Sequence, residues 1–267
     1  MIESNREIKK PSEKREIMPR FEASALRGYC VSVLTASGVE RSCAEAVADA
    51  LIDAELTGVS THGVSRLAVY MQRMDAGVMS RENNIRIVRE STSTLVVDAG
   101  NSLGAAAAKF AMERCIAKAK ETGCCFASVH SSNHFGTAAY YTRLAAAQDM
   151  IGFACTNLKG KIAPFGSAEP YMGTNPISVA APSDALPVVL DMAPSVVALG
   201  KLILAQKLGK SGRWIRTADP PRTPRPVVPA RSCRSAARKA AASPSWSMCF
   251  AAFSAAAPTV RICMTSM

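Results

Sequence analysis

Apolar side chains recur at helical spacing through the first third of the chain. The first such stretch begins at Phe21 and is expected to stop at Gly38. A second helix is predicted over about 42–57, and a third begins near Val64. Each has one apolar face, which an amphipathic helix buries against its neighbours. The residues expected to face inward are Phe21, Ala25, Tyr29, Val33 and Leu34 in the first helix, Ala44, Val47, Leu51 and Ile52 in the second, and Leu67, Tyr70, Met71 and Met74 in the third.

Short β-rich runs alternate with helical stretches between residues 85 and 209. The alanine-rich run 105–120 contains no helix breaker, and Gly123 is expected to end its helix. Further helices are predicted over 137–147 and 192–208. This alternation of strands and helices predicts an α/β fold. The expected strands are 85–89, 94–97, 125–129, 152–155, 177–180 and 188–190.

The composition changes after Gly212. The last 55 residues contain no Gly and no Glu, and Ala, Arg, Pro and Ser account for 34 of them. The segment 210–267 also holds ten of the 32 basic residues but one of the 21 acidic ones, so it carries most of the net charge of +11. A globular segment of this length normally needs glycine for its turns. We therefore divide the chain into a disordered extension (1–18), a helical region (19–100), an α/β region (101–209) and a basic tail of low order (210–267).

The sequence argues against two broad classes of protein, membrane proteins and secreted proteins. No apolar run reaches the length of about 18 residues that a membrane helix needs. The first 20 residues mix both signs of charge and have no apolar core, so they are not a secretory signal. The nine cysteines are irregularly spaced and form no C-x-x-C pair, which indicates reduced thiols in a cytoplasmic protein.

One candidate site lies between the second and third predicted helices. His62 precedes Gly63, and Arg66 falls in the first turn of the next helix, near backbone N–H groups that favour an anion. An arginine can bind a carboxylate through two parallel hydrogen bonds, while a nearby imidazole bonds an adjacent oxygen. The same spacing is also typical of a loop histidine that caps a helix beside a solvated arginine. The pattern leaves both interpretations open.

A second candidate follows the predicted strand 125–129. His134 lies after the end of that strand, where open α/β folds place reacting groups. A neutral imidazole there could take a proton from a hydroxyl group or return it to a carbonyl oxygen. The spacing of His130 and His134 would suit a metal on a helix, but the intervening Ser-Ser-Asn forms turns and no nearby acid completes a ligand set. We therefore expect no metal, and a structural role for His130.

Two polar loops, 157–166 and 173–176, combine Gly, Asn and Pro with exposed backbone donors. Lys159 and Lys161 in the first loop could meet a phosphate, although two tight turns with solvated lysines explain the pattern equally well. No G-x-G occurs anywhere in the chain. The Rossmann fingerprint and the P-loop are therefore both absent.

Four stretches together resemble one protein family. They are STHGVSRL at 60–67, SSNHFG at 131–136, PFGSAEPYMGTNP at 164–176 and LDMAPS at 190–195. In this order, from residue 21 to residue 209, the chain is similar to the malate/L-lactate dehydrogenase family. That family also includes ureidoglycolate dehydrogenase, sulfolactate dehydrogenase, diketogulonate reductase and piperideine/pyrroline-2-carboxylate reductase. It is distinct from the Rossmann-fold lactate dehydrogenases, which agrees with the absent glycine motif.

The resemblance implies hydride transfer between NAD or NADP and C2 of a small 2-oxo or 2-hydroxy acid, or of a cyclic 2-imino acid. It implies a homodimer in which region 19–100 serves substrate binding and dimerisation and region 101–209 forms a non-Rossmann nucleotide-binding domain. By matching position, His134 would be the acid/base residue, and its protonated imidazole would stabilise the developing alkoxide. The substrate carboxylate would be oriented by His62 and Arg66, with Tyr70 as a further contact. The residues implied to line the cofactor are Gly173, Thr174, Asn175, Pro176, Asp191, Met192, Ala193 and Lys159.

The basic tail departs from the resemblance. The family has glycine-rich stretches there, including a loop with a cofactor-binding lysine. Shifting the reading frame by one base from Ile215 onward permits codons for family-like pieces such as ILPIGGP and GVLSGGPYGADLHDIY. We therefore hypothesise a frameshift near 212–214 that replaced the C-terminal third, and we expect an inactive, truncated family member with little or no turnover.

Some points stay open at this level. The sequence indicates no membrane partner, and the identity of the substrate acid and the choice between NAD and NADP are not determined. A different class of function, non-specific nucleic-acid binding through the basic tail, is the alternative to the enzyme.

Overall fold

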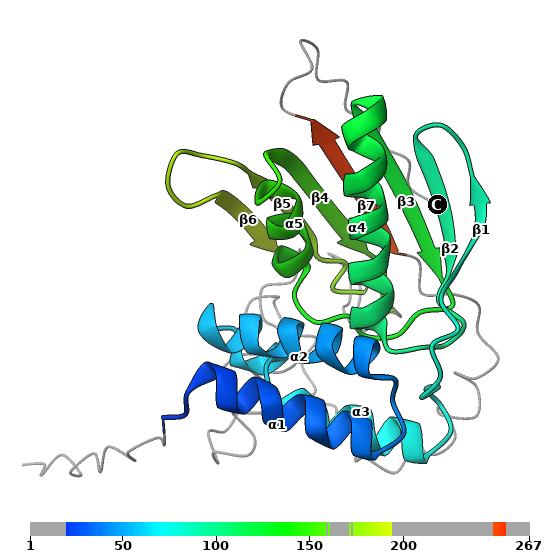
Figure 1. Cartoon of the computed structure of the whole chain (residues 1–267), viewed down its shortest axis with the longest axis vertical. Helices are drawn as coiled ribbons and strands as arrows, with labels where there is room; N and C mark the ends of the chain where they lie inside the picture. The colour runs from blue at the N-terminus through cyan, green and yellow to red at the C-terminus, as the bar shows by residue number, and fades with distance from the viewer. Residues whose placement is uncertain (1–19, 159, 161–170, 172, 194–247, 255–267) are drawn as a thin grey trace, which may run out of the picture.

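Five helices and seven strands make up the part of the chain that the computed structural model describes, which is residues 20–158, 160, 171, 173–193 and 248–254. Three helices, α1 (Ala23–Ala36), α2 (Arg41–Leu56) and α3 (Ser65–Asp75), form a layer of their own (Figure 1). Two more, α4 (Gly104–Thr122) and α5 (Ala138–Ala146), cover one face of a sheet. The class is α/β, as the alternating pattern predicted.

The sheet has the order β1-β2-β3-β7-β4-β5-β6. Its strands pair antiparallel except β2 and β3, which are parallel. Because β7 is antiparallel to both of its neighbours, β3 and β4 run in the same direction, and β6 runs with them. The strands are β1 (Arg86–Glu90), β2 (Thr94–Asp98), β3 (Cys124–His130), β4 (Met150–Thr156), β5 (Ile177–Ala181), β6 (Val188–Met192) and β7 (Met248–Ser254).

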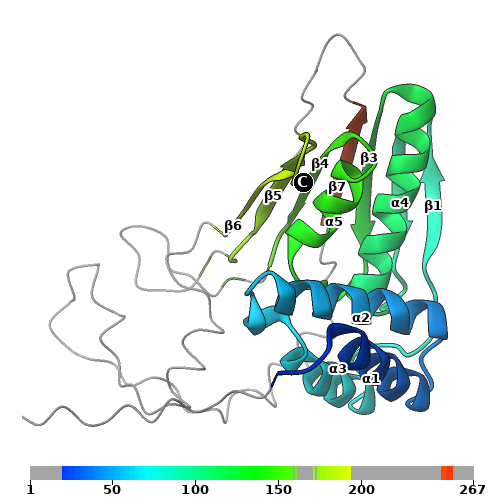
Figure 2. The same cartoon turned by 60° about the vertical axis from the view of Figure 1, so that its left-hand side comes forward.

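This topology brings several strand ends to one edge of the sheet. β2, β3, β4 and β6 all end there, and β5 begins there, since Ile177 pairs with both Cys155 and Met192. The layer of α1, α2 and α3 lies along the same edge in two views of the molecule (Figures 1 and 2). Loops that follow strands therefore face the helical layer, which places polar loop residues between the two layers.

The core lies between the sheet and the helices α4 and α5. Residues of β3 alternate between buried and half-buried, with Cys125, Ala127 and Val129 turned toward the helices. The first half of the buried face of α4 is mostly alanine, and Ala107, Ala108 and Ala111 are fully buried, while Met112 and Ile116 bring larger side chains into the core further along the helix. The helix ends at Gly123, as predicted, where a φ of 82° suits a residue without a side chain.

The predicted inward face of the first helix needs a correction. Of the residues predicted to face inward, Leu34 is buried and Val33 packs partly against the core, but Phe21 and Tyr29 are 70% and 60% exposed and Ala25 is exposed as well. Cys30, which was not predicted, is buried. The helix is rotated so that the face containing Cys30 and Leu34, rather than the aromatic residues, packs against the core. The prediction was wrong for Phe21 and Tyr29 because it relied on the hydrophobicity of these large aromatic side chains alone. In the second and third helices, the predicted inward residues are buried, apart from Met71, which is partly buried against the core.

Residues 192–267 differ in part from the sequence-based expectation. Met192, predicted to begin a helix, is the last residue of β6, and residues 194–208 lie outside the described residues. In the tail expected to have low order, residues 248–254 form β7 between β3 and β4, because an apolar run of this length suits a buried strand. The rest of 210–267, and the extension 1–18, also lie outside the described residues. Among the helices that the structure describes, none is long and apolar enough to cross a bilayer.

Candidate active site

Three residues from distant parts of the chain meet between the helical layer and the sheet edge. His134 lies in the loop after β3, while His62 and Tyr70 come from the segment between α2 and α3 and from α3 itself. The imidazole rings of His62 and His134 are stacked, with centroids 5.4 Å apart and planes inclined by 18°. The Tyr70 hydroxyl lies 2.8 Å from Nδ1 of His134. The structure therefore brings together the histidines that sequence reasoning had named separately.

The orientation of Arg66 is fixed by the residue before His62. Nε of Arg66 donates a hydrogen bond of 2.6 Å to the backbone oxygen of Thr61. The hydroxyl of Thr61 lies 3.0 Å from Nδ1 of His62. Thr61 thus contacts both side chains predicted to orient a carboxylate. With Nε engaged, the remaining N–H donors of Arg66 belong to its two terminal nitrogens, which suit a carboxylate.

The backbone at the start of α3 holds an anion, but that anion belongs to the protein. Oε1 of Glu55, at the end of α2, accepts a 2.8 Å hydrogen bond from the backbone N–H of Val64. The same carboxylate lies against Gly63, where a Cβ atom would come within 2.0 Å of Oε1. The sequence predicted a bound anion near these N–H groups, and in the structure the carboxylate of Glu55 bonds one of them. The Val64 N–H is therefore already used within the protein.

Burial determines the protonation states of His62 and Tyr70. Burial, and then the nearby Arg66 charge, lower the pKa of His62, so its imidazole is neutral at pH 7. Burial raises the pKa of Tyr70 well above its ordinary value, although Arg66 and Arg73 act in the opposite direction. The phenol therefore stays protonated at neutral pH. It can donate to Nδ1 of a neutral His134 or accept from the Nδ1–H of a protonated one, and in both of these forms Nε2 carries a proton.

His130 is apart from this cluster. It is the last residue of β3, its Nδ1 lies 3.0 Å from the Ser131 hydroxyl, and the same nitrogen is 3.7 Å from Oδ1 of Asp98. Across the described residues, no group of three or more His, Cys, Asp or Glu side chains is placed to hold a metal ion. These contacts are those of a residue at a strand end rather than of a reacting group.

The residues implied to line a cofactor share the sheet edge with the His134 loop. The turn of Gly173, Thr174, Asn175 and Pro176 directly precedes β5, and its Asn175 side chain accepts a 3.0 Å hydrogen bond from the Leu158 N–H. Asp191 and Met192 end β6, followed by Ala193. The Asp191 carboxylate lies near the Ala139 N–H at the start of α5, which suggests a capping role beside any contact to a ligand. Lys159 and Lys161 lie outside the described residues.

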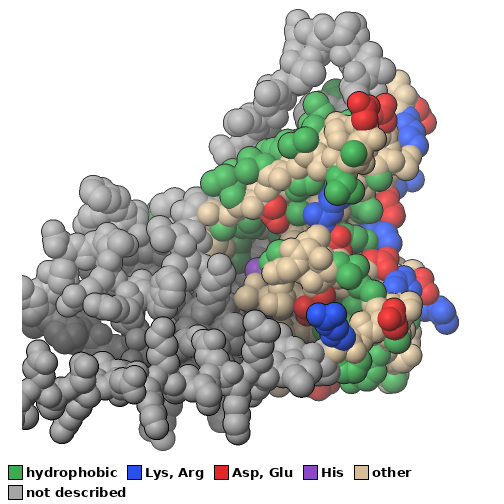
Figure 3. All heavy atoms as spheres, turned by 90° about the vertical axis from the view of Figure 1, so that its left-hand side faces the viewer, with side chains coloured by type: hydrophobic (Ala, Val, Ile, Leu, Met, Phe, Trp, Pro, Cys, Tyr) green, Lys and Arg blue, Asp and Glu red, His purple; other side chains and the backbone are tan. Residues whose placement is uncertain are grey.

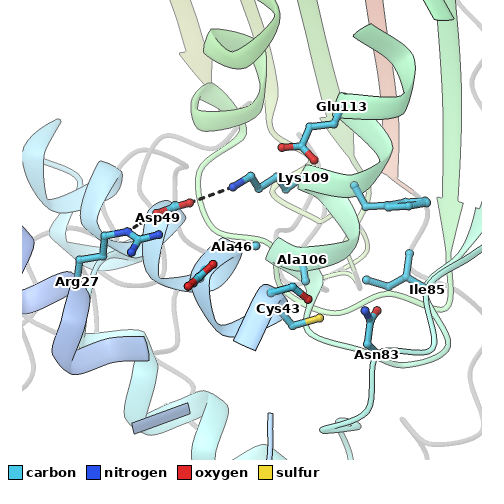
Figure 4. Close-up of a pocket in the computed structure, with 12 residues that line it drawn as sticks. Arg27, Cys43, Ala46, Asp49, Asn83, Ile85, Ala106, Lys109 and Glu113 are labelled. Atoms are coloured by element: carbon cyan, nitrogen blue, oxygen red, sulfur yellow. Dashed lines mark hydrogen bonds and ion pairs between the residues drawn. The ribbon is translucent and has the colours of Figure 1, made fainter. Parts of the chain in front are cut away.

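Two ion pairs from α2 hold the helical layer to the helices of the sheet. Asp49 accepts a 3.0 Å hydrogen bond from Lys109 of α4 and one of 2.6 Å from Arg27 of α1. One turn further along α2, Asp53 pairs with Arg143 of α5. Figure 4 shows Arg27, Asp49 and Lys109 on the wall of a pocket of about 390 Å³. The pocket contains none of the residues proposed here for substrate or cofactor, so we assign these ion pairs to stability.

We expect Asp49→Asn to lower the free energy of unfolding by about 1–3 kcal/mol at pH 7, because it leaves two cations with a neutral partner. Burial raises the pKa of Asp49, but the hydrogen bonds from Arg27 and Lys109 outweigh it and lower the pKa. This stabilisation is present above the unfolded-state pKa of about 3.9 and is lost as the pH falls through the lower folded-state value.

Urea unfolding between pH 7 and pH 2 measures this effect. The difference between the parent and Asp49→Asn should shrink toward the acid end of the range. Asp75→Asn is the control, since its ion pair with Arg81 is largely exposed and should contribute little. Equal effects of the two substitutions would contradict the assignment.

The fold and the site together define a class of α/β protein. In this class, polar side chains from a helical layer meet a histidine that follows a strand of a mixed sheet. The chain belongs to the malate/L-lactate dehydrogenase family, whose family model matches residues 21–214. Malate dehydrogenase from Pyrococcus horikoshii is 41% identical over 191 residues, covering 72% of this chain and 53% of that protein. Its solved structure superposes with a TM-score of 0.67 and covers 69% of this chain and 53% of that chain.

Two further relatives are named with their cofactors. A (2R)-3-sulfolactate dehydrogenase (NADP(+)) from Chromohalobacter salexigens is 38% identical, covering 67% of this chain and 54% of that protein. A ureidoglycolate dehydrogenase (NAD(+)) from Escherichia coli K12 is 32% identical, covering 67% and 51%. The chain therefore spans about half the length of the curated relatives it matches.

Proposed function

We propose that this protein is an oxidoreductase that transfers a hydride between NAD or NADP and C2 of a small 2-oxo or 2-hydroxy acid, with a cyclic 2-imino acid as the related alternative. The observation that carries the proposal is the hydrogen bond of Tyr70 to His134, with the ring of His62 stacked on that same imidazole. Membership of the dehydrogenase family supports it. The names of the relatives, which include malate and sulfolactate dehydrogenases, support a 2-hydroxy acid in particular.

In this proposal each polar side chain has one task. The terminal nitrogens of Arg66 bind the substrate carboxylate, and the neutral imidazole of His62 bonds a neighbouring oxygen. His134, protonated on both ring nitrogens, donates from Nδ1 to the Tyr70 oxygen and passes its Nε2 proton to the carbonyl oxygen as C2 is reduced, which leaves a neutral imidazole. The alkoxide is thereby neutralised as it forms, so the contact strengthens in the transition state.

The cofactor supplies the hydride when it is bound. The turn 173–176 and residues Asp191, Met192 and Ala193 would hold it together with Lys159. Their fit is supported by position, because the turn and the end of β6 lie at the same sheet edge as the His134 loop. We propose either NAD or NADP, since the relatives use both by name.

We further propose a homodimer in the cytoplasm. Six cysteines are free thiols, which supports a reducing compartment: Cys30, Cys43, Cys115, Cys124, Cys125 and Cys155. Apolar side chains run along the arm formed by β5 and β6 (Figure 3), where Val188, Leu190 and Met192 are 69%, 53% and 51% exposed. Exposed apolar surface of this kind supports a contact with a second chain. Light scattering after gel filtration tests it, and a monomer at micromolar concentration would contradict it.

The segment after Gly212 is proposed to be out of frame. The family match ends at residue 214, close to the change in composition, which supports this reading. We define the frame-restored protein as the product obtained when the reading frame is shifted by one base at this point. Resequencing the gene across codons 205–220 tests the proposal, and an uninterrupted frame in independent clones would overturn it.

The test of function is a panel of 2-oxo acids and cyclic 2-imino acids, each offered with NADH and with NADPH. We expect the frame-restored protein to oxidise the cofactor with at least one of them, and the 267-residue chain to show little or no turnover. The panel includes oxaloacetate, pyruvate and 3-sulfopyruvate. Failure of the frame-restored protein on every compound would refute the proposed reaction.

Tyr70→Phe removes the hydroxyl that bonds Nδ1 of His134 and retains the ring. We expect kcat of the frame-restored protein to fall about 10-fold, the value of one good hydrogen bond, with little change in KM. Because the pKa of Tyr70 is raised, the parent should keep this bond to high pH. The measurement is the pH profile of kcat for both proteins. A variant with the parental kcat and profile would show that the bond does not orient His134.

A further inference from the structure

The residue before the proposed acid/base histidine is unusually well bound. Asn133 is only 6% exposed. Its side-chain nitrogen lies 3.0 Å from the backbone oxygen of Asn101, 2.9 Å from Oδ1 of Asn101 and 3.0 Å from the backbone oxygen of Ser102. An amide nitrogen has two hydrogens, so these three acceptors share them. Asn133 therefore ties the loop after β3 to the loop after β2.

The backbone reinforces this connection. The N–H of Asn101 donates a 2.8 Å hydrogen bond to the Ser131 oxygen, and Asn101 itself has a φ of 61°, a left-handed conformation that asparagine tolerates. At the start of α4, a Cβ atom on Gly104 would come within 2.1 Å of the Asn133 oxygen and 2.6 Å of the His134 oxygen. The helix thus abuts the backbone that carries His134, which leaves that loop little freedom on this side.

The other end of the Asn133 side chain faces α3. Its Oδ1 accepts a hydrogen bond of 3.4 Å from a terminal nitrogen of Arg73. Arg73 follows Tyr70 by three residues and Arg66 by seven, so all three lie on one side of the helix. The amide therefore connects the His134 loop with α3, the helix that carries Tyr70 and Arg66. An asparagine suits the position because its side chain both donates and accepts.

We propose that Asn133 is a positioning residue, which holds His134 against Tyr70 by linking its loop to residues 101–102 and, through Arg73, to α3. The inference rests on the proposed role of His134 as acid and base. Its physical basis is the narrow range of hydrogen-bond geometry. The Tyr70–His134 bond is 2.8 Å long, and a shift of about 1 Å in the loop would break it.

The test uses the full 267-residue chain and needs no turnover. The chain contains three histidines, so ¹⁵N-labelled histidine gives three sets of imidazole signals, each assigned by a single His→Gln variant. In Asn133→Ala we expect the His134 nitrogen signals to shift and the nuclear Overhauser contact between the Tyr70 and His134 rings to be lost. Asn133→Asp can still accept from Arg73 but cannot donate, and it should show the same loss.

Asn83→Ala is the matched control. Asn83 also donates from its amide nitrogen, to Glu40, but this exposed bond lies away from His134. It should leave all three imidazole signals unchanged. Thermal unfolding and the amide spectrum show whether each variant is folded. A folded Asn133 variant with the parental His134 signals and ring contact would overturn the proposal.

Arg73→Gln decides the question if neither Asn133 variant folds. Its side chain is exposed, and the substitution leaves the three bonds of the Asn133 nitrogen in place. We expect a weaker contact between the Tyr70 and His134 rings, and unchanged His134 signals would overturn the proposal. Because the readout is the ring geometry and not turnover, failure of this inference can be distinguished from failure of the proposed function.

Discussion

His134→Gln is expected to lower kcat of the frame-restored protein by about 10²–10⁴-fold. Glutamine can still form hydrogen bonds, but it cannot carry a proton to the carbonyl oxygen near neutral pH. The substrate carboxylate would still bind Arg66, so KM should change much less than kcat. Steady-state kinetics with the best acid of the panel, under saturating cofactor, measures both constants.

His130→Gln is the matched control for this prediction. His130 is four residues earlier, at the end of β3, and its imidazole contacts Ser131 and Asp98 rather than Tyr70. Its substitution should leave kcat near the parental value. If His134→Gln kept the parental kcat, the acid/base assignment would be wrong. If His130→Gln also lost much of its kcat, the loss in His134→Gln could be explained by disturbance of the end of β3.

The elements that the sequence predicted well are those determined by local chemistry. The helix that ends at Gly123 needed only an uninterrupted alanine-rich run and a residue that accepts a left-handed backbone. The strand before His134 needed only a short apolar run followed by turn residues. The position of His134 after a strand could therefore be predicted from the sequence.

Other features depend on contacts between residues far apart in the sequence. Nothing near Tyr29 indicates that α1 turns this residue outward and buries Cys30 instead, because the choice is made by packing against the protein core. The insertion of β7 between β3 and β4 joins segments about 100 residues apart, a pairing that no local pattern encodes. The local sequence pattern determines whether a segment forms a helix or a strand. Tertiary packing determines which side of a helix is buried and which strands pair with one another.

The supporting residues of the site were missed for the same reason. Glu55 occupies the start of α3 although it belongs to α2, and Asn133 binds a loop that precedes it by about 30 residues. The resemblance implied that Tyr70 contacts the substrate, and the sequence did not indicate that its hydroxyl also lies 2.8 Å from Nδ1 of His134. The only sequence signal for these contacts was the density of polar residues in the two histidine loops, which marks a site without assigning partners.

Arg66→Gln is expected to raise KM for the 2-oxo acid roughly 10²–10³-fold, because two charge-assisted hydrogen bonds to the carboxylate are lost. The Val64 N–H cannot replace them, since it is already bonded to Glu55. Arg66→Lys keeps the charge but not the planar pair of donors, so an intermediate KM is expected. The fall in kcat should be smaller than for His134→Gln.

A second readout separates a local effect of Arg66 from misfolding. The Arg66 charge lowers the pKa of His62, so its removal should raise that pKa, while burial continues to hold it below the ordinary value. Titration of the labelled imidazoles follows this shift in the chain without substrate. Arg81→Gln, which removes the exposed pair with Asp75 and a hydrogen bond to the Met74 backbone oxygen, should change neither KM nor the His62 titration. If Arg66→Gln raised the pKa of His62 but left KM at the parental value, the guanidinium would be a neighbour of the site that does not bind the substrate.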